Sequence, residues 1–300
     1  MKGAEAPGRK VWRAYTGRRV RPALLLLVFL AAPAATEEPD VPAPRNGPWK
    51  PLGPPREGDW RWHYPQEKGQ TFAAYRAASP VRGAGERDTI YIQPFLTRPP
   101  RDGRLLERME TVLEAFFGRP VTVLPNRALP EGSYVLRRRQ ASVRRMVADL
   151  LGSLPEDGLF LLAVTDRDLY VGRLDSVFGW GSLELRVGVM STARIADGPD
   201  EERIRHRTTT LAAHEACHML SLPHCVFYGC LMNGARTLEE SDARPGTLCP
   251  VCREKLCWNL GLDPKARYRA LAQACDRAEL GSLAAEVRGA DAVTSSGQKD

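Results

Sequence analysis

Residues 214–232 read HEACHMLSLPHCVFYGCLM, and residues 249–252 read CPVC. Three of the chain's five histidines and six of its seven cysteines lie between His214 and Cys257, whereas residues 36–216 contain no cysteine. Histidine and cysteine crowded into one short window are typical of metal ligands before they are typical of disulfides. The window therefore predicts that metal binding organises this part of the chain.

The first half of the window matches a catalytic zinc motif. Residues 208–220 (TTTLAAHEACHML) predict a helix, with the threonines as its cap. His214 and His218 are four residues apart and share one face of that helix, because four residues advance it by about 400°. Two imidazoles so placed can hold one zinc, and Glu215 can act as general base on its water. His224 completes a three-histidine pattern, which leaves a fourth position for water.

Four cysteines in the second half of the window predict another zinc. The spacings C-x4-C and C-x2-C fit a closed, tetrahedral structural site, which would explain how a loop-rich segment stays folded. The ligands would be Cys225, Cys230, Cys249 and Cys252. Two disulfides are the alternative if the chain is exported. Cys257 and Cys275 are left over, and their pairing stays open.

Periodicity upstream predicts strands alternating with helices. The strands are expected at 89–95, 120–124, 159–165 and 187–191, and the helices at 103–117 and 140–152. This order predicts a largely parallel sheet. Beyond Ser221 the pattern fades, so residues 222–260 are expected to be loops. A terminal helix over 264–285 and a frayed tail over 286–300 complete the prediction.

The N-terminus resembles a secretory leader. Residues 1–22 carry seven basic residues and one acidic residue, and an apolar run of thirteen residues follows at 23–35. That run is shorter than the ~20 residues that a spanning helix needs, so residues 1–35 predict a cleaved export signal. There are two alternatives. The segment is an uncleaved membrane anchor, or Met1 lies upstream of the true translation start. Residues 36–57, with seven prolines, predict a linker or irregular strap.

The long window resembles the signature of the archaemetzincins, which is H-E-x-x-H-x-x-G-x-x-H-C-x4-C-x-M, a spacer near seventeen residues, and C-x-x-C. This chain has a sixteen-residue spacer, and Ser221 stands at the glycine position. The resemblance covers residues 58–263 and implies an archaemetzincin-like catalytic domain there. It assigns the catalytic zinc to the three histidines, the base to Glu215 and the second zinc to the four cysteines. Met232 would be the Met-turn methionine beneath the histidines.

The resemblance implies an α+β, metzincin-like fold. It would have a twisted mixed sheet with backing helices, an active-site helix and a small zinc-stapled C-terminal lobe, and a C-terminal helix and flexible tail would follow over residues 264–300. An antiparallel edge strand would align an extended peptide. The glycine replaced by Ser221 would supply a left-handed backbone conformation, at a cost of ~1 kcal/mol for serine.

These features together predict a zinc metallopeptidase that hydrolyses peptide or protein substrates with two zinc ions. The alternative is a non-catalytic zinc module that binds peptides or proteins through the cleft expected between the sheet and the small lobe. A four-cysteine nucleic-acid binder is disfavoured, because residues 36–300 sum to about +1 charge.

No stable membrane span is expected. Secretion or periplasmic export follows if the leader is cleaved, and a cytoplasmic protein is the alternative. Oligomeric state and substrate preference stay open.

Overall fold

The computed structural model describes residues 39–42, 47–83, 85–172 and 174–296. The predicted leader, residues 1–35, lies outside this part of the chain. Within the described residues, no helix is long and apolar enough to cross a membrane. The helices are α1 (Trp60–His63), α2 (Phe72–Ala77), α3 (Leu105–Phe117), α4 (Val143–Leu151), α5 (Glu201–His218), α6 (Leu238–Asp242), α7 (Pro250–Leu260), α8 (Pro264–Arg277) and α9 (Gly281–Ser296). The strands are β1 (Thr89–Phe95), β2 (Val121–Val123), β3 (Tyr134–Val135), β4 (Gln140–Ser142), β5 (Gly158–Thr165), β6 (Leu169–Val171), β7 (Leu174–Val177), β8 (Gly179–Gly181) and β9 (Val187–Ser191).

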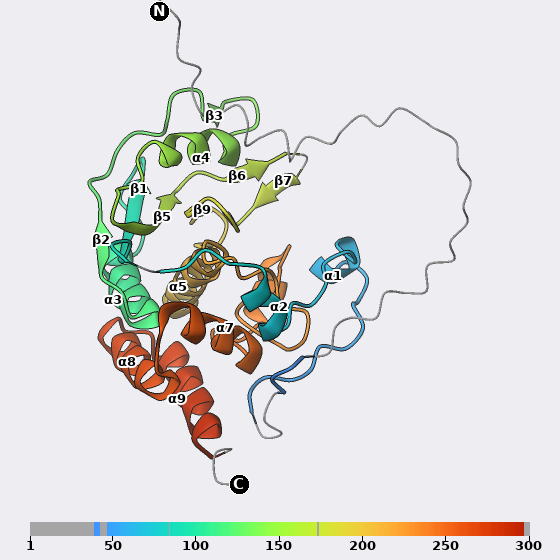
Figure 1. Ribbon diagram of the computed structural model, residues 1–300. Coiled ribbons are helices and arrows are strands. Elements are labelled where there is room, and N and C mark those ends of the chain that lie inside the picture. Colours follow the sequence, from blue (N-terminus) through green and yellow to red (C-terminus); the bar gives the residue numbers. More distant parts are fainter. Residues whose placement is uncertain (1–38, 43–46, 84, 173, 297–300) are drawn as a thin grey trace, which may run out of the picture. The chain divides into compact units, whose positions relative to one another are not determined.

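A five-stranded sheet in the order β2-β1-β5-β9-β8 forms the centre of the fold (Figure 1). Its strands are parallel except for β8, which pairs antiparallel with β9 at the edge. All eight residues of β5 are buried, as expected for a parallel strand covered on both faces. The apolar run at 159–165 therefore predicted this strand correctly.

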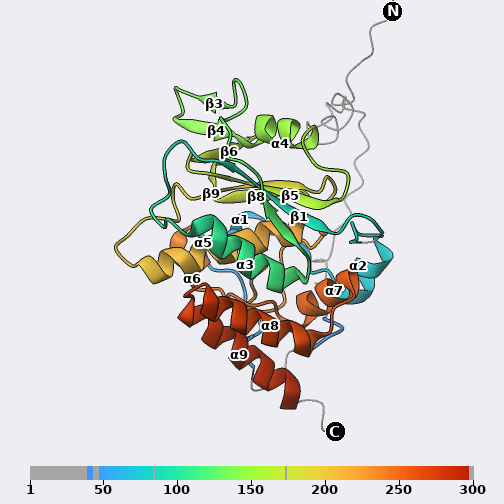
Figure 2. The ribbon, with the colours of Figure 1, turned by 90° about the vertical axis from the view of Figure 1, so that its left-hand side faces the viewer.

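Helices cover both faces of this sheet (Figure 2). α3 and α5 pack on one face, whereas α4 packs on the other face beside a second sheet of order β3-β4-β6-β7. α3 buries its apolar residues at helical spacing and ends at Gly118, whose φ of +58° is left-handed. The sequence predicted that end, because glycine adopts this conformation without a side-chain clash.

The helix expected at 140–152 is shorter in the structure. Gln140–Ser142 form strand β4, in which Ala141 pairs with Leu169 of β6. α4 begins only at Val143. Periodicity could not detect this change, because the ladder partner lies 28 residues further along the chain.

The region after Ser221 is more regular than predicted. The expectation of loops throughout residues 222–260 is wrong, because α6 and α7 lie there. α7 has Pro250 at its first turn and ends at Gly261 with φ +66°, the usual proline-first, glycine-last arrangement. The terminal helix is two helices, α8 and α9, because Glu279 takes a left-handed φ of +54° between them. The frayed tail expected from residue 286 is wrong up to Ser296, since α9 continues to that residue.

The proline-rich segment contacts the domain. Trp49 is only 2% exposed, and Pro51 forms a β-bridge with Tyr228. Leu52 donates its N–H to the carbonyl of Phe227. The segment therefore runs along the loop that follows His224.

Candidate active site and cysteine cluster

Helix α5 supplies two of the three candidate zinc ligands. It begins at Glu201, seven residues before the predicted start, because the side chain of Asp200 caps it by accepting from the N–H of Arg203 at 3.0 Å. The threonines expected as caps lie inside the helix, where the hydroxyls of Thr208 and Thr210 donate to carbonyls four residues earlier. Every residue from Thr208 to Leu220 is buried.

The structure brings the three predicted histidines together. His214 and His218 lie on one face of α5, with their Nε2 atoms 3.1 Å apart. The ring of His224 lies 4.9 Å from that of His218 and 5.5 Å from that of His214, measured between centroids. Each offers one nitrogen within 4.8 Å of the others. Among the described residues, this group contains no fourth His, Cys, Asp or Glu.

A left-handed residue returns the chain to the histidines. Ser221 has φ +63°, as the resemblance implied for this position. Leu222 then donates its N–H to the carbonyl of Cys217 at 3.2 Å, which closes the last turn of α5 and directs the chain toward His224. The Ser221 hydroxyl accepts from the N–H of Val81 at 3.0 Å and donates to the carbonyl of Leu183 at 2.6 Å.

Each imidazole is oriented through its Nδ1 atom. The acceptor is the carbonyl of Leu231 for His214, at 2.8 Å, and the carbonyl of Leu222 for His218, at 2.7 Å. The Nδ1 of His224 lies 2.9 Å from the Glu67 carboxylate. An acceptor at Nδ1 selects the tautomer whose Nε2 is free to bind a metal.

Burial keeps two of the imidazoles neutral. Desolvation lowers the pKa of His214 well below its usual value and the pKa of His218 to about 3. Neutral imidazole is the form that binds zinc, because protonation would occupy the ligand nitrogen. The ligand face therefore has the protonation state that zinc requires.

Glu215 is buried beside the edge strand. Desolvation raises its pKa to about 8, against the opposing influence of the Arg244 charge and of the backbone N–H of Gly181. The same helix turns Cys217 away from the histidines and into the core, where it is fully buried. Met232 is fully buried in the same core cluster.

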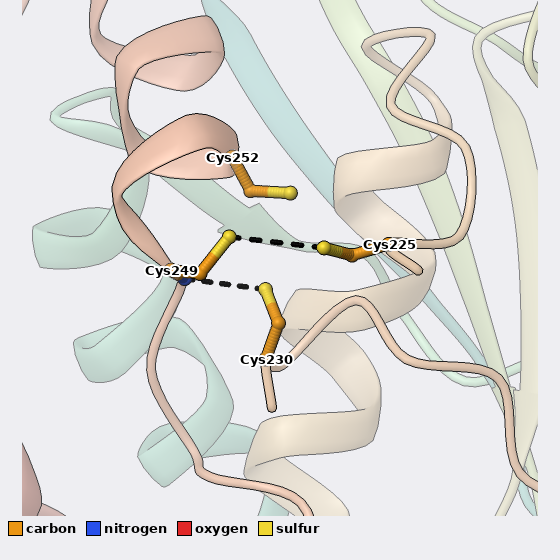
Figure 3. A group of neighbouring side chains, drawn as sticks. All are labelled: Cys225, Cys230, Cys249 and Cys252. Atoms are coloured by element: carbon orange, nitrogen blue, oxygen red, sulfur yellow. Dashed lines mark hydrogen bonds between the residues drawn. The ribbon is translucent and has the colours of Figure 1, made fainter. Parts of the chain in front are cut away.

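The four predicted cysteine ligands also meet (Figure 3). Cys225 and Cys230 come from the loop after His224, and Cys249 and Cys252 come from the start of α7. Their sulfur atoms all lie within 4.8 Å of one another, and those of Cys225 and Cys249 are 3.7 Å apart. Cys230 Sγ accepts from the N–H groups of Met232 and Cys249. All seven cysteines are free thiols, so the alternative of two disulfides is not what the structure contains.

Both groups fit zinc by their donor chemistry. Four buried thiols at mutual contact suit a closed tetrahedral structural site, whereas three converging imidazoles suit an open one. The N–H donors at Cys230 Sγ and the acceptors at each Nδ1 are the supporting contacts that metal ligands usually have.

Comparison with known proteins agrees with this chemistry. The model of peptidase family M54 matches residues 129–257. Archaemetzincin-2 of Rattus norvegicus is 30% identical over 288 residues, covering 81% of this chain and 79% of the relative. The archaemetzincin of Methanopyrus kandleri is 34% identical over 167 residues, covering 55% of this chain and 94% of the relative. The crystal structure of that archaeal protein superposes with a TM-score of 0.53 at 30% identity, covering 60% of this chain and 99% of that one.

The chain belongs to the archaemetzincin family.

Family membership and the donor groups together make this archaemetzincin a zinc metallopeptidase with a mixed α/β fold.

Three residues that contact the histidines or Glu215 were not predicted from the sequence. Glu67 lies 157 residues before His224, and Gly181 lies 34 residues before Glu215. Arg244, which donates to the carbonyl of Asn233 at 2.8 Å and lies 3.4 Å from His214 Nδ1, was also missed. None of the three belongs to a recognisable spacing pattern.

Proposed function

We propose that this archaemetzincin hydrolyses peptide bonds with one zinc held by His214, His218 and His224. The observation that carries the proposal is the convergence of three imidazoles, two of them kept neutral by burial, with no fourth side chain of the described residues in the group. When bound, zinc lowers the pKa of a water ligand to about 7 and polarises a carbonyl. Glu215 follows His214 directly and is buried beside the edge strand.

Glu215 has the role of general base and then general acid. In its ionised form, the carboxylate takes a proton from the attacking water as the C–O bond forms, and it passes that proton to the amine nitrogen as the C–N bond breaks. Strand β8 borders Glu215 at the edge of the sheet. An extended substrate can add to such an edge through main-chain hydrogen bonds. The substrates are therefore peptides or unfolded protein segments.

We further propose a second, structural zinc held by Cys225, Cys230, Cys249 and Cys252. It would fix the loop that carries His224 to the start of α7, because two ligands come from each segment. The catalytic domain would span residues 58–263, as the resemblance implies.

The test compares metal content with turnover. We expect two zincs per chain in the wild type and one in His218→Ala, measured by elemental analysis. Glu215→Gln should keep both zincs and lower kcat for peptide hydrolysis by ~10²–10⁴-fold. Peptide cleavage by Glu215→Gln at the wild-type rate would end the assignment of the base and would favour the non-catalytic zinc module.

Export is a separate proposal that rests on residues 1–35. Their basic stretch and apolar run motivate a cleaved leader. The mature N-terminus, measured by mass spectrometry after expression of the full chain in its native host, decides it. An intact Met1 or a chain that is found only in the cytoplasm would refute cleavage.

A further inference from the structure

The third histidine is oriented by a carboxylate from a distant segment. Oε1 and Oε2 of Glu67 lie 2.9 and 3.1 Å from His224 Nδ1. The other two histidines use backbone carbonyls, and both carbonyls come from residues close to the site along the chain. His224 differs because it stands in a loop beyond the helix, where its side chain is 17% exposed. Its position therefore depends on contacts from outside its own segment.

Trp60 holds this carboxylate in place. Its indole Nε1 donates to Glu67 Oε2 at 2.7 Å, and its ring lies edge-on to His224 with centroids 4.9 Å apart. The ring of Tyr64 also packs against the Trp60 ring, with centroids 4.2 Å apart. Gly234 makes room for the indole, because a Cβ there would lie 2.4 Å from the Trp60 ring. The backbone N–H of Trp60 donates to Glu240 of α6.

Two donors therefore converge on one carboxylate. The indole N–H can only donate, and an imidazole that binds metal through Nε2 must carry its proton on Nδ1. A carboxylate accepts from both at once, whereas an amide has one acceptor oxygen and presents an NH₂ group to the second donor. A carboxylate hydrogen-bonded to Nδ1 is a partner that metal-bound histidines commonly have, and it fixes the tautomer and the orientation of the ring.

We propose that Glu67, held by Trp60, is the positioning residue for His224 and sets the zinc affinity of the three-histidine site. This inference rests on the proposed function, because it assumes that His224 binds the catalytic zinc. Glu67 contacts His224 at Nδ1, the nitrogen that would not bind the metal, so it acts through the imidazole. The segment before β1 thus completes the metal site, although Glu67 lies 157 residues before His224 in the sequence.

The test measures zinc affinity in the full chain by competition with a chelator. Glu67→Gln and Glu67→Ala should each weaken the three-histidine site by ~10–100-fold, while the cysteine site keeps its zinc. The visible spectrum of the Co²⁺-loaded chain should change in both variants. Glu57→Gln is the matched control, because Glu57 is exposed in the same segment, and it should leave the affinity and spectrum unchanged.

A double-variant cycle with Trp60→Phe tests whether a carboxylate is needed at position 67 because two donors converge on it. Removing the indole N–H leaves His224 as the single donor, so Glu67→Gln should cost less affinity in the Trp60→Phe background than in the wild type. Equal affinity in wild type and Glu67→Ala, or an equal cost of Glu67→Gln in both backgrounds, would overturn the inference.

His218→Ala separates the inference from the proposed function. If His218→Ala loses one zinc and Glu67→Ala does not weaken binding, only the positioning role fails. If His218→Ala keeps both zincs, the three-histidine site itself fails. Glu67→Gln is isosteric, and its thermal unfolding midpoint is expected to stay close to that of the Glu57→Gln control, so a lost fold cannot be mistaken for a lost contact.

Discussion

The side chain of Glu215 packs directly against the backbone of Gly179 at the edge of the central sheet. This contact joins the edge strand β8 to the active-site helix α5. It requires the strand to approach the helix closely, and the sequence Gly179-Trp180-Gly181 allows that approach. A Cβ at Gly181 would lie 2.3 Å from the Glu215 carbonyl oxygen, and one at Gly179 would lie 2.6 Å from Glu215 Oε1. The two glycines leave space for the base, while Trp180 continues the ladder with Val189.

Gly179→Ala should displace the Glu215 carboxylate without unfolding the chain. The new methyl group meets the end of a side chain, which can rotate, rather than backbone. We expect kcat to fall by ~10–100-fold, because small misplacements of catalytic groups have costs of that order, with zinc content unchanged. Gly53→Ala is the control, since nothing lies within 4 Å of its Cβ. Wild-type kcat in Gly179→Ala would show that the carboxylate tolerates the shift.

Ser221 tests two opposing contributions to stability. Its left-handed φ of +63° costs ~1 kcal/mol relative to glycine, whereas its hydroxyl makes two hydrogen bonds worth about 0.5–1.5 kcal/mol each. Ser221→Ala keeps the backbone cost and loses both bonds, so it should lower the free energy of unfolding by about 1–3 kcal/mol. Ser221→Gly should change it by less than Ser221→Ala does. Urea unfolding measures both, and an alanine variant as stable as the wild type would contradict the argument.

Cys252→Ser should release one zinc and destabilise the C-terminal half of the domain. Where a metal joins separate segments, its binding free energy contributes directly to folding. We expect the free energy of unfolding to drop by more than ~4 kcal/mol, with the three-histidine zinc retained if the fold survives. Cys257→Ala is the control, because Cys257 is buried but lies outside the cluster, and it should keep both zincs. Disulfide-linked peptides in the native chain would refute the metal assignment.

The sequence predicted the parts of this fold that depend on local pattern. The strands at 89–95, 159–165 and 187–191 follow from apolar and β-branched runs, and the pairing of His214 with His218 follows from helical periodicity alone. Motif spacing also identified all seven side chains that the structure gathers into two groups. These features could be predicted because each is determined within a few residues or by a fixed ligand geometry.

Contacts between distant segments could not be predicted. Glu67 reaches His224 only because the chain before β1 lies along the loop after α5, and no periodicity encodes that path. The start of α5 was predicted too late because threonines are good caps, whereas Asp200 was the residue actually free to accept the terminal N–H. The small residues of α9 gave a weak apolar signal, although Leu283 and Val287 pack into the core.

Leu283→Ala tests whether α9 is part of the core. Leu283 is 3% exposed, and Gly246, three residues before Cys249, lies against its side chain. Truncating a buried leucine removes apolar contacts and leaves a cavity, so the free energy of unfolding should fall by about 2–5 kcal/mol. Leu136→Ala is the matched control, because Leu136 is 80% exposed. The same substitution there should change the free energy of unfolding by less than ~0.5 kcal/mol. If both variants unfold at the wild-type urea concentration, α9 does not stabilise the loop that leads to the cysteine cluster. A loss confined to Leu283→Ala means that the C-terminal helix supports that loop, and zinc content measured on the same variant shows whether the support extends to the cysteines.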